Sequence, residues 1–122
     1  FLSLMRSAGS FDRIPEALID AGSALSGCGP AFVYMFIEAL SDGGVACGLP
    51  GDKAVFYAAQ TVLGAAKNLL VSKKHCGELK DAVCSPGGTT IEGVRTLESK
   101  GLRAAAAEAV VSAYKRTLEL KK

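Results

Sequence analysis

The feature that most constrains the fold is a stretch of apolar residues at 52–71, "DKAVFYAAQTVLGAAKNLLV", which predicts a helix that is apolar on nearly all sides. Such a helix must be buried on more than one side. A chain of 122 residues forms one compact domain, which leaves little room for so enclosed a helix. We therefore expect two subunits that interleave as a homodimer. A larger homo-oligomer stays open, and the alternative is the central helix of a monomeric bundle. Short interaxial distances are permitted by small residues along the helix: Ala58, Ala59, Gly64, Ala65 and Ala66.

The remainder of the chain also reads as helical, which predicts an all-α helical bundle. A helical pattern starts at Pro15, and further helices are expected over 30–46, 90–99 and 102–120, with a short helical piece at 77–83. Gly48 and Gly101 act as helix stops. Gly43 and Gly44 weaken the helix at 30–46 by roughly 1 kcal/mol each relative to Ala, so they suggest a close approach by another element.

The first fourteen residues have a mixed pattern. Residues 1–5 could end an amphipathic helix, and residues 11–14 are short enough for a strand. No other strand pattern follows, so that strand would have no sheet to join.

Composition excludes several classes of function. The chain is 49% hydrophobic with a net charge of +2, and its Lys and Arg residues are spread out, so we expect no nucleic-acid partner. The most apolar run, 30–37, is too short to span a bilayer and no leader segment is visible, so we expect a cytoplasmic protein without membrane contact.

The cysteines predict neither a metal site nor a disulfide framework. Cys28, Cys47, Cys76 and Cys84 form no CxxC pair, and the spacing of His75 to its neighbouring cysteines does not suit zinc. We expect reduced thiols, mostly buried, and we expect His75 to be a solvated or hydrogen-bonding group.

The segment that offers chemistry is "CSPGGTT" at 84–90, here called the glycine turn. Pro86 fixes the backbone and Gly87 and Gly88 free it, so the chain turns sharply. Thr89 followed three residues later by Glu92 fits a capping box, which predicts a helix start.

A helix start provides unpaired N–H donors and the positive end of the helix dipole. Around the backbone donors of Gly87, Gly88 and Thr89, the hydroxyls of Ser85, Thr89 and Thr90 complete a donor set suited to a carboxylate or a phosphate. The alternative is a turn that caps its helix and binds nothing.

Several blocks of the sequence resemble one family in order. "ALSGCGPAFVYMFIEALSDGGVACGLP", "AAQTVLGAAKNLL" and "GELKDAVCSPGGTTIEGVRTLESKGLRAA" closely resemble the C-terminal half of pyrroline-5-carboxylate reductase, and "DAVCSPGGTTIEG" is highly specific to that family. The likeness covers about residues 15–120.

The resemblance implies a two-domain Rossmann reductase of proline biosynthesis that uses NADPH or NADH. Residues 1–14 would be the tail of the dinucleotide-binding domain, which holds most of the cofactor site. Residues 15–122 would be the helical dimerisation and substrate-binding domain. The substrate carboxylate would lie against Ser85, Gly88 and Thr89, and the Thr90 hydroxyl would reach the ring nitrogen.

The sequence departs from the family at three points and leaves two other functions open. Cys28 and Cys76 stand in the usual G-S-G-P and H-P-G motifs, and Ala46-Cys47 replaces a common Lys-Met. The alternatives are a helical dimerisation module without activity and a related imine reductase with another carboxylate substrate.

Overall fold

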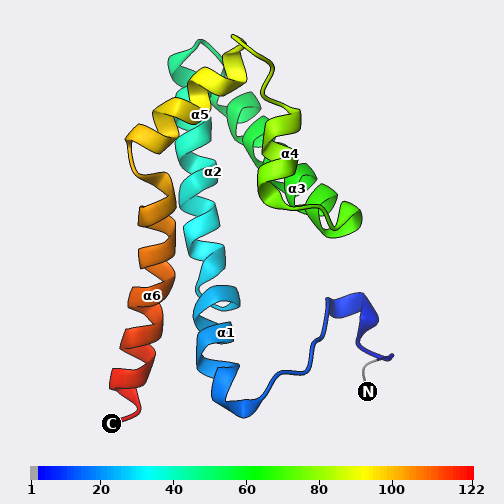
Figure 1. The fold of residues 1–122 in the computed structure, drawn as a ribbon, viewed down its shortest axis with the longest axis vertical. Helices are drawn as coiled ribbons and strands as arrows, with labels where there is room; N and C mark the ends of the chain where they lie inside the picture. Colours follow the sequence, from blue (N-terminus) through cyan, green and yellow to red (C-terminus); the bar gives the residue numbers. More distant parts are fainter. Residues whose placement is uncertain (1–2) are drawn as a thin grey trace.

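The computed structural model describes residues 3–122, which fold into helices without a strand in that range. Two short 3-10 helices, Arg6–Ala8 and Glu16–Leu18, precede six α-helices (Figure 1). The α-helices are α1 (Ile19–Ser26), α2 (Gly29–Ala46), α3 (Gly51–Ser72), α4 (Cys76–Ala82), α5 (Thr89–Ser99) and α6 (Leu102–Leu120). The predicted all-α class is confirmed. The bounds of α2 to α5 differ from the predicted ones by one residue and those of α6 agree, whereas α1 begins four residues after Pro15, behind a 3-10 helix.

The helices form two arms that meet at one end of the molecule (Figure 1). In one arm, α6 runs beside α1 and α2. In the other, α3 folds back from the end of α2, and α4 follows it. The shorter α5 crosses the end where the arms meet, so the glycine turn between α4 and α5 also lies there.

At the corner between α2 and α3, the two helices approach each other closely at a glycine, Gly44. Gly48 has a φ of 106°, which ends α2, and Pro50 is the N-cap of α3. A Cβ on Gly44 would lie 3.2 Å from Leu49 Cδ1 and 3.4 Å from Ala54 Cβ, whereas one on Gly43 would meet nothing within 4 Å. The predicted close approach is therefore confirmed at Gly44, whereas at Gly43 no described element of the same chain makes it.

An ion pair closes the far end of the first arm. Lys121 Nζ lies 2.7 Å from Asp20 Oδ2, which joins the C-terminus to α1 across the sequence. Gly101 adopts a left-handed φ of 77° between α5 and α6, as its predicted role of helix stop requires.

The described chain buries very little of its apolar surface. Its accessible surface is 9832 Å², whereas a compact monomer of this mass exposes roughly 6,200 Å². The buried apolar residues are Ala24, Ala54 and Ala58, and no large side chain is fully buried within the described residues. The helices thus present broad apolar faces that a single chain does not cover.

Two expectations from the sequence, the burial of the cysteines and the absence of an apolar segment long enough to span a bilayer, are wrong. Cys28, Cys47 and Cys76 are exposed and Cys84 is partly so, because the thin packing of the chain does not cover them. The segments Glu16–Ala46 and Gly51–Ser72 are long and apolar enough to span a bilayer, so the argument from the short 30–37 run is wrong. The absence of membrane contact stays a prediction.

The N-terminal segment forms no strand in its described part. Phe1 and Leu2 lie outside the described residues, a 3-10 turn follows, and residues 9–15 have no regular secondary structure. That residues 1–14 belong to a preceding domain stays a prediction.

Candidate functional site

The glycine turn is a tight β-turn at the junction of α4 and α5. The Gly88 N–H donates to the Ser85 carbonyl at 3.1 Å, and Gly87 has a φ of 69°. Pro86 followed by a glycine with positive φ is the pattern of a type II turn. The predicted sharp turn is thus confirmed, and the Gly87 conformation is one that side chains rarely adopt.

Gly88 serves a different purpose from Gly87. Its φ of −81° and ψ of 176° suit any residue, but a Cβ there would collide with the Ser85 hydroxyl. Gly88 is therefore needed for space and Gly87 for backbone conformation. The Ser85 hydroxyl thus lies beside Gly88, at the N-cap of α5.

The start of α5 differs from the predicted capping box. The N-cap is Gly88, Thr89 is already the first helical residue, and no side chain caps the helix. Glu92 pairs with Arg95 at 3.4 Å instead of reaching back. The box fails because the turn carries the extended N-cap conformation on Gly88, one residue earlier than the Thr-x-x-Glu spacing indicates.

The missing cap leaves α5 with free donors at its N-terminus. The first N–H groups of a helix have no partner within it, which here applies to Thr89, Thr90 and Ile91. The Gly88 N–H, by contrast, is occupied by the Ser85 carbonyl. A carboxylate at this helix start would therefore meet Thr89 and Thr90 before Gly88.

The predicted site residues occupy one short segment, and the structure leaves them accessible. Ser85, Thr89 and Thr90 are exposed, while Gly88 is half-buried. Their geometry suits recognition of one anion by neutral donors and the helix dipole. Glu38 and Asp42, two carboxylates one turn apart on α2, are also exposed.

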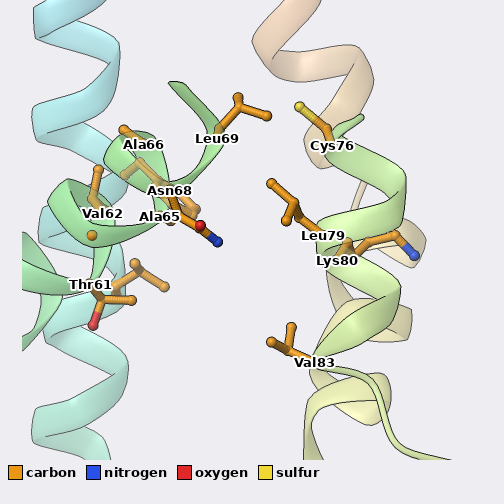
Figure 2. Close-up of a pocket in the computed structure, with 13 residues that line it drawn as sticks. Thr61, Val62, Ala65, Ala66, Asn68, Leu69, Cys76, Leu79, Lys80 and Val83 are labelled. Carbon is orange, nitrogen blue, oxygen red and sulfur yellow. The ribbon is translucent and has the colours of Figure 1, made fainter. Parts of the chain in front are cut away.

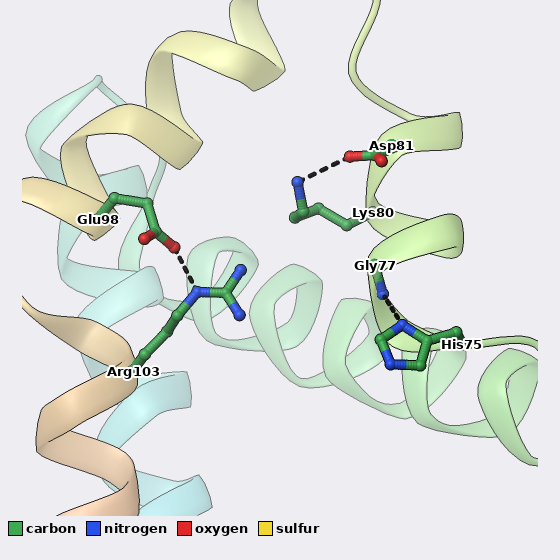
Figure 3. A network of polar contacts seen from close by, with 6 residues as sticks. All are labelled: His75, Gly77, Lys80, Asp81, Glu98 and Arg103. Carbon is green, nitrogen blue, oxygen red and sulfur yellow. Dashed lines mark hydrogen bonds and ion pairs between the residues drawn. The ribbon is translucent and has the colours of Figure 1, made fainter.

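Two ion pairs near the glycine turn were missed from the sequence. Lys80 Nζ lies 2.8 Å from Asp81 Oδ1 on α4, and the Arg103 guanidinium on α6 bonds the Glu98 carboxylate of α5 (Figure 3). The hydrogen bond that Lys80 donates to Asp81 raises the pKa of Lys80, and the one that Arg103 donates to Glu98 raises the pKa of Arg103. Both cations remain charged and paired, so neither is a proton donor for chemistry. The signal available in the sequence was the Glu98-to-Arg103 spacing across Gly101.

A large apolar cleft of about 740 Å³ lies between α3 and α4 (Figure 2). Val62, Ala65 and Leu69 line it from α3, and Leu79 and Val83 line it from α4. The few polar groups on its walls do not converge, which is the character of a packing surface. Within residues 3–122, no group of three potential ligands could hold a metal ion.

The fold defines a class: an all-α helical domain whose broad apolar faces are left uncovered by a single chain. Residues 16–120 match the family described as "Pyrroline-5-carboxylate reductase dimerisation". The chain belongs to this family, and the resemblance found in the sequence is confirmed.

Individual relatives agree with the family match. The chain is 54% identical over 117 residues to the pyrroline-5-carboxylate reductase of Pisum sativum, covering 96% of the chain and 43% of the relative. It is 47% identical to the Escherichia coli reductase over 121 residues, covering 99% of the chain and 45% of the relative. The chain therefore spans less than half the length of these curated relatives.

Solved structures share the fold. The pyrroline-5-carboxylate reductase of Coxiella burnetii superposes with a TM-score of 0.90 at 38% identity, covering 99% of this chain and 45% of that one. The Plasmodium falciparum enzyme, solved with NADP bound, gives a TM-score of 0.86 at 36% identity, covering 94% and 44%.

Proposed function

We propose that this chain is the C-terminal, dimer-forming and substrate-binding part of a pyrroline-5-carboxylate reductase, which reduces 1-pyrroline-5-carboxylate to L-proline. The observation that carries the proposal is the uncapped start of α5 behind the glycine turn, within a chain that matches the reductase family over residues 16–120. Relatives at about half identity bear the name of this enzyme.

Dimerisation follows from the surface that one chain leaves open. The excess over a compact monomer is some thousands of Å², which is the size of obligate homodimer interfaces. The apolar cleft between α3 and α4 and the outer face of α3 belong to this surface. We therefore propose that a second copy of the chain covers them.

The substrate carboxylate binds at the start of α5 in this proposal. The N–H groups of Thr89 and Thr90 and the Ser85 hydroxyl supply neutral hydrogen bonds, and the helix dipole adds attraction. The Gly88 N–H stays in the turn and acts indirectly, by holding Ser85 in place.

The Thr90 hydroxyl is assigned to the ring nitrogen. NADPH or NADH supplies the hydride when bound, and the imine carbon accepts it while the nitrogen gains a proton. Thr90 donates a hydrogen bond at that nitrogen and orients the ring, since its side chain leaves the same helix start that holds the carboxylate. The neutral donors of the glycine turn fit one carboxylate, and we assign no residue of this chain to the cofactor.

A chimaera tests the proposal. The N-terminal part of the Pisum sativum reductase, joined ahead of this chain in place of its own C-terminal part, should oxidise NADPH with pyrroline-5-carboxylate. Thr90→Val in the chimaera should lower kcat/KM about thirty- to a hundredfold or more, or roughly 2–3 kcal/mol, with folding preserved. An inactive but folded dimer would favour the non-catalytic module. Activity that Thr90→Val leaves unchanged would place the substrate elsewhere.

A further inference from the structure

His75, the single histidine of the chain, caps α4 through its ring. Its backbone is extended, with φ −69° and ψ 143°, and its Nδ1 accepts the Gly77 N–H at 3.1 Å (Figure 3). Gly77 leaves room for the ring, because a Cβ there would lie 3.3 Å from Nδ1. The His75 carbonyl also accepts the Leu79 N–H at 3.1 Å, which starts the helix.

The helix that this cap begins has little other support in the described chain. α4 has seven residues, fewer than a helix needs for stability on its own. A cleft separates it from α3, and a second cleft of about 410 Å³, lined by Lys80 of α4, separates it from α5 and α6. No other helix packs extensively on α4 within the described part of the single chain, so there the cap is a main determinant of whether α4 is formed.

The far end of α4 leads directly into the glycine turn. The Val83 N–H bonds the Lys80 carbonyl at 3.2 Å, and the Cys84 N–H bonds the Asp81 carbonyl at 3.1 Å. Cys84 precedes Ser85, so the last turn of α4 sets where the glycine turn begins. Loss of α4 would free the leading end of the turn.

We propose that His75 is a positioning residue that makes the glycine turn sensitive to pH. Only the neutral ring has an acceptor at Nδ1; the protonated ring carries an N–H there, which would face the Gly77 N–H. Protonation also brings a positive charge to the positive end of α4. Acidification that protonates the imidazole therefore opens the cap.

The charged groups around the cap do not replace the lost bond. They are Lys73 and Lys74 on the connector and Glu78, Lys80 and Asp81 on α4, whereas the α3 residues that line the cleft carry no charge. Among the described residues, none of them forms an ion pair with the imidazole, and Asp81 is held by Lys80.

Amide hydrogen exchange of the chain tests the cap. Corrected for intrinsic rates, the protection of the Leu79 amide should fall at least threefold from pH 7.5 to pH 5.5, while amides of α6 keep theirs. His75→Asn is the matched control, because Asn caps a helix without titrating, and its protection should not change over this range. An equal fall in the control, or no fall in the native chain, would overturn the proposal.

The link to the glycine turn rests on the proposed function and has its own measurement. Proline keeps its zwitterionic charge over this pH range. The difference between its inhibition constants in the native chimaera and in the His75→Asn chimaera therefore reports the effect of the cap on the glycine turn. Inhibition should weaken several-fold at pH 5.5 in the native sequence and not in His75→Asn. Identical pH profiles in the two would overturn the link. No inhibition by proline at either pH would count against the proposed function, with the exchange result still standing.

Discussion

Gly88 is packed against Ser85 so closely that its N–H bonds the Ser85 carbonyl at 3.1 Å and its Cα has no room for a methyl group beside the Ser85 hydroxyl. The neighbouring Gly87 has open space but a left-handed backbone. Two adjacent glycines thus serve different physical needs, and substitution separates them.

Gly87→Ala should destabilise the chain by about 1 kcal/mol, because the positive φ at this position is strained for alanine. Gly88→Ala should cost less stability and instead displace the Ser85 side chain, so that proline inhibits the chimaera at least tenfold more weakly. Urea denaturation and inhibition constants measure the two effects. In a Ser85→Ala background, Gly88→Ala should cost little further affinity, and an undiminished loss there would contradict the collision.

Gly43 and Gly44 offer a second matched pair, on α2. Gly43→Ala should stabilise the chain by about 0.5–1 kcal/mol, since nothing lies near its missing Cβ and Ala is the better helix former. Gly44→Ala should stabilise the chain less, because the added methyl group would displace the side chains of Leu49 and Ala54. Gly44→Val should destabilise by roughly 1–3 kcal/mol through overpacking. Equal gains for both Ala variants would show that α2 and α3 are not in contact there.

The outer face of α3 should hold the dimer together. Leu63 is 60% exposed in the single chain and lies outside the cleft between α3 and α4. Leu63→Glu should weaken self-association at least tenfold, about 1.4 kcal/mol, because an apolar contact is replaced by a charge. Sedimentation equilibrium measures this. Unchanged self-association in this variant would show that this face of α3 lies outside the dimer interface.

Lys73 is the one described residue other than glycine with a positive φ, at 57°, where it ends α3. Lys73→Gly should stabilise the chain by several tenths to about 1 kcal/mol, since the left-handed C-cap position favours glycine. Lys74→Gly, at a neighbouring position without this conformation, should not stabilise. Thermal unfolding at equal protein concentration compares them, and a loss of stability in Lys73→Gly would contradict the backbone conformation.

Lys80 supplies a reference for the pH behaviour of α4. Asp81 raises the pKa of Lys80, so the contribution of the charged lysine is present below its unfolded pKa and is lost only as pH rises through the folded value. The window therefore lies above about pH 10.4. Lys80→Met should leave the pH 5–8 profile of α4 amide exchange unchanged in shape. A profile that vanished in this variant would assign the sensitivity to Lys80 and not to His75.

The helices were predictable because residues at their ends have unambiguous chemistry. Gly48, Pro50 and Gly101 stop or start helices through backbone preferences that operate in any context. The capping box at Thr89 was not predictable in this way, since the N-cap position depends on where the preceding turn leaves Gly88.

Burial was less predictable than secondary structure. The cysteines were expected to be mostly buried as small apolar side chains, yet Cys28 and Cys76 are exposed in the chain. Hydropathy indicates that a face will be covered but does not say by which molecule. The same reason explains why α3 could be recognised as too apolar for a monomer, while the shape of the cleft beside it could not be derived.

The large accessible surface of the single chain has a consequence for how it reaches its folded state. If most apolar faces are covered only by another copy, folding is a reaction of second order, and the folded fraction depends on how much chain is present. Dilution then acts as a denaturant.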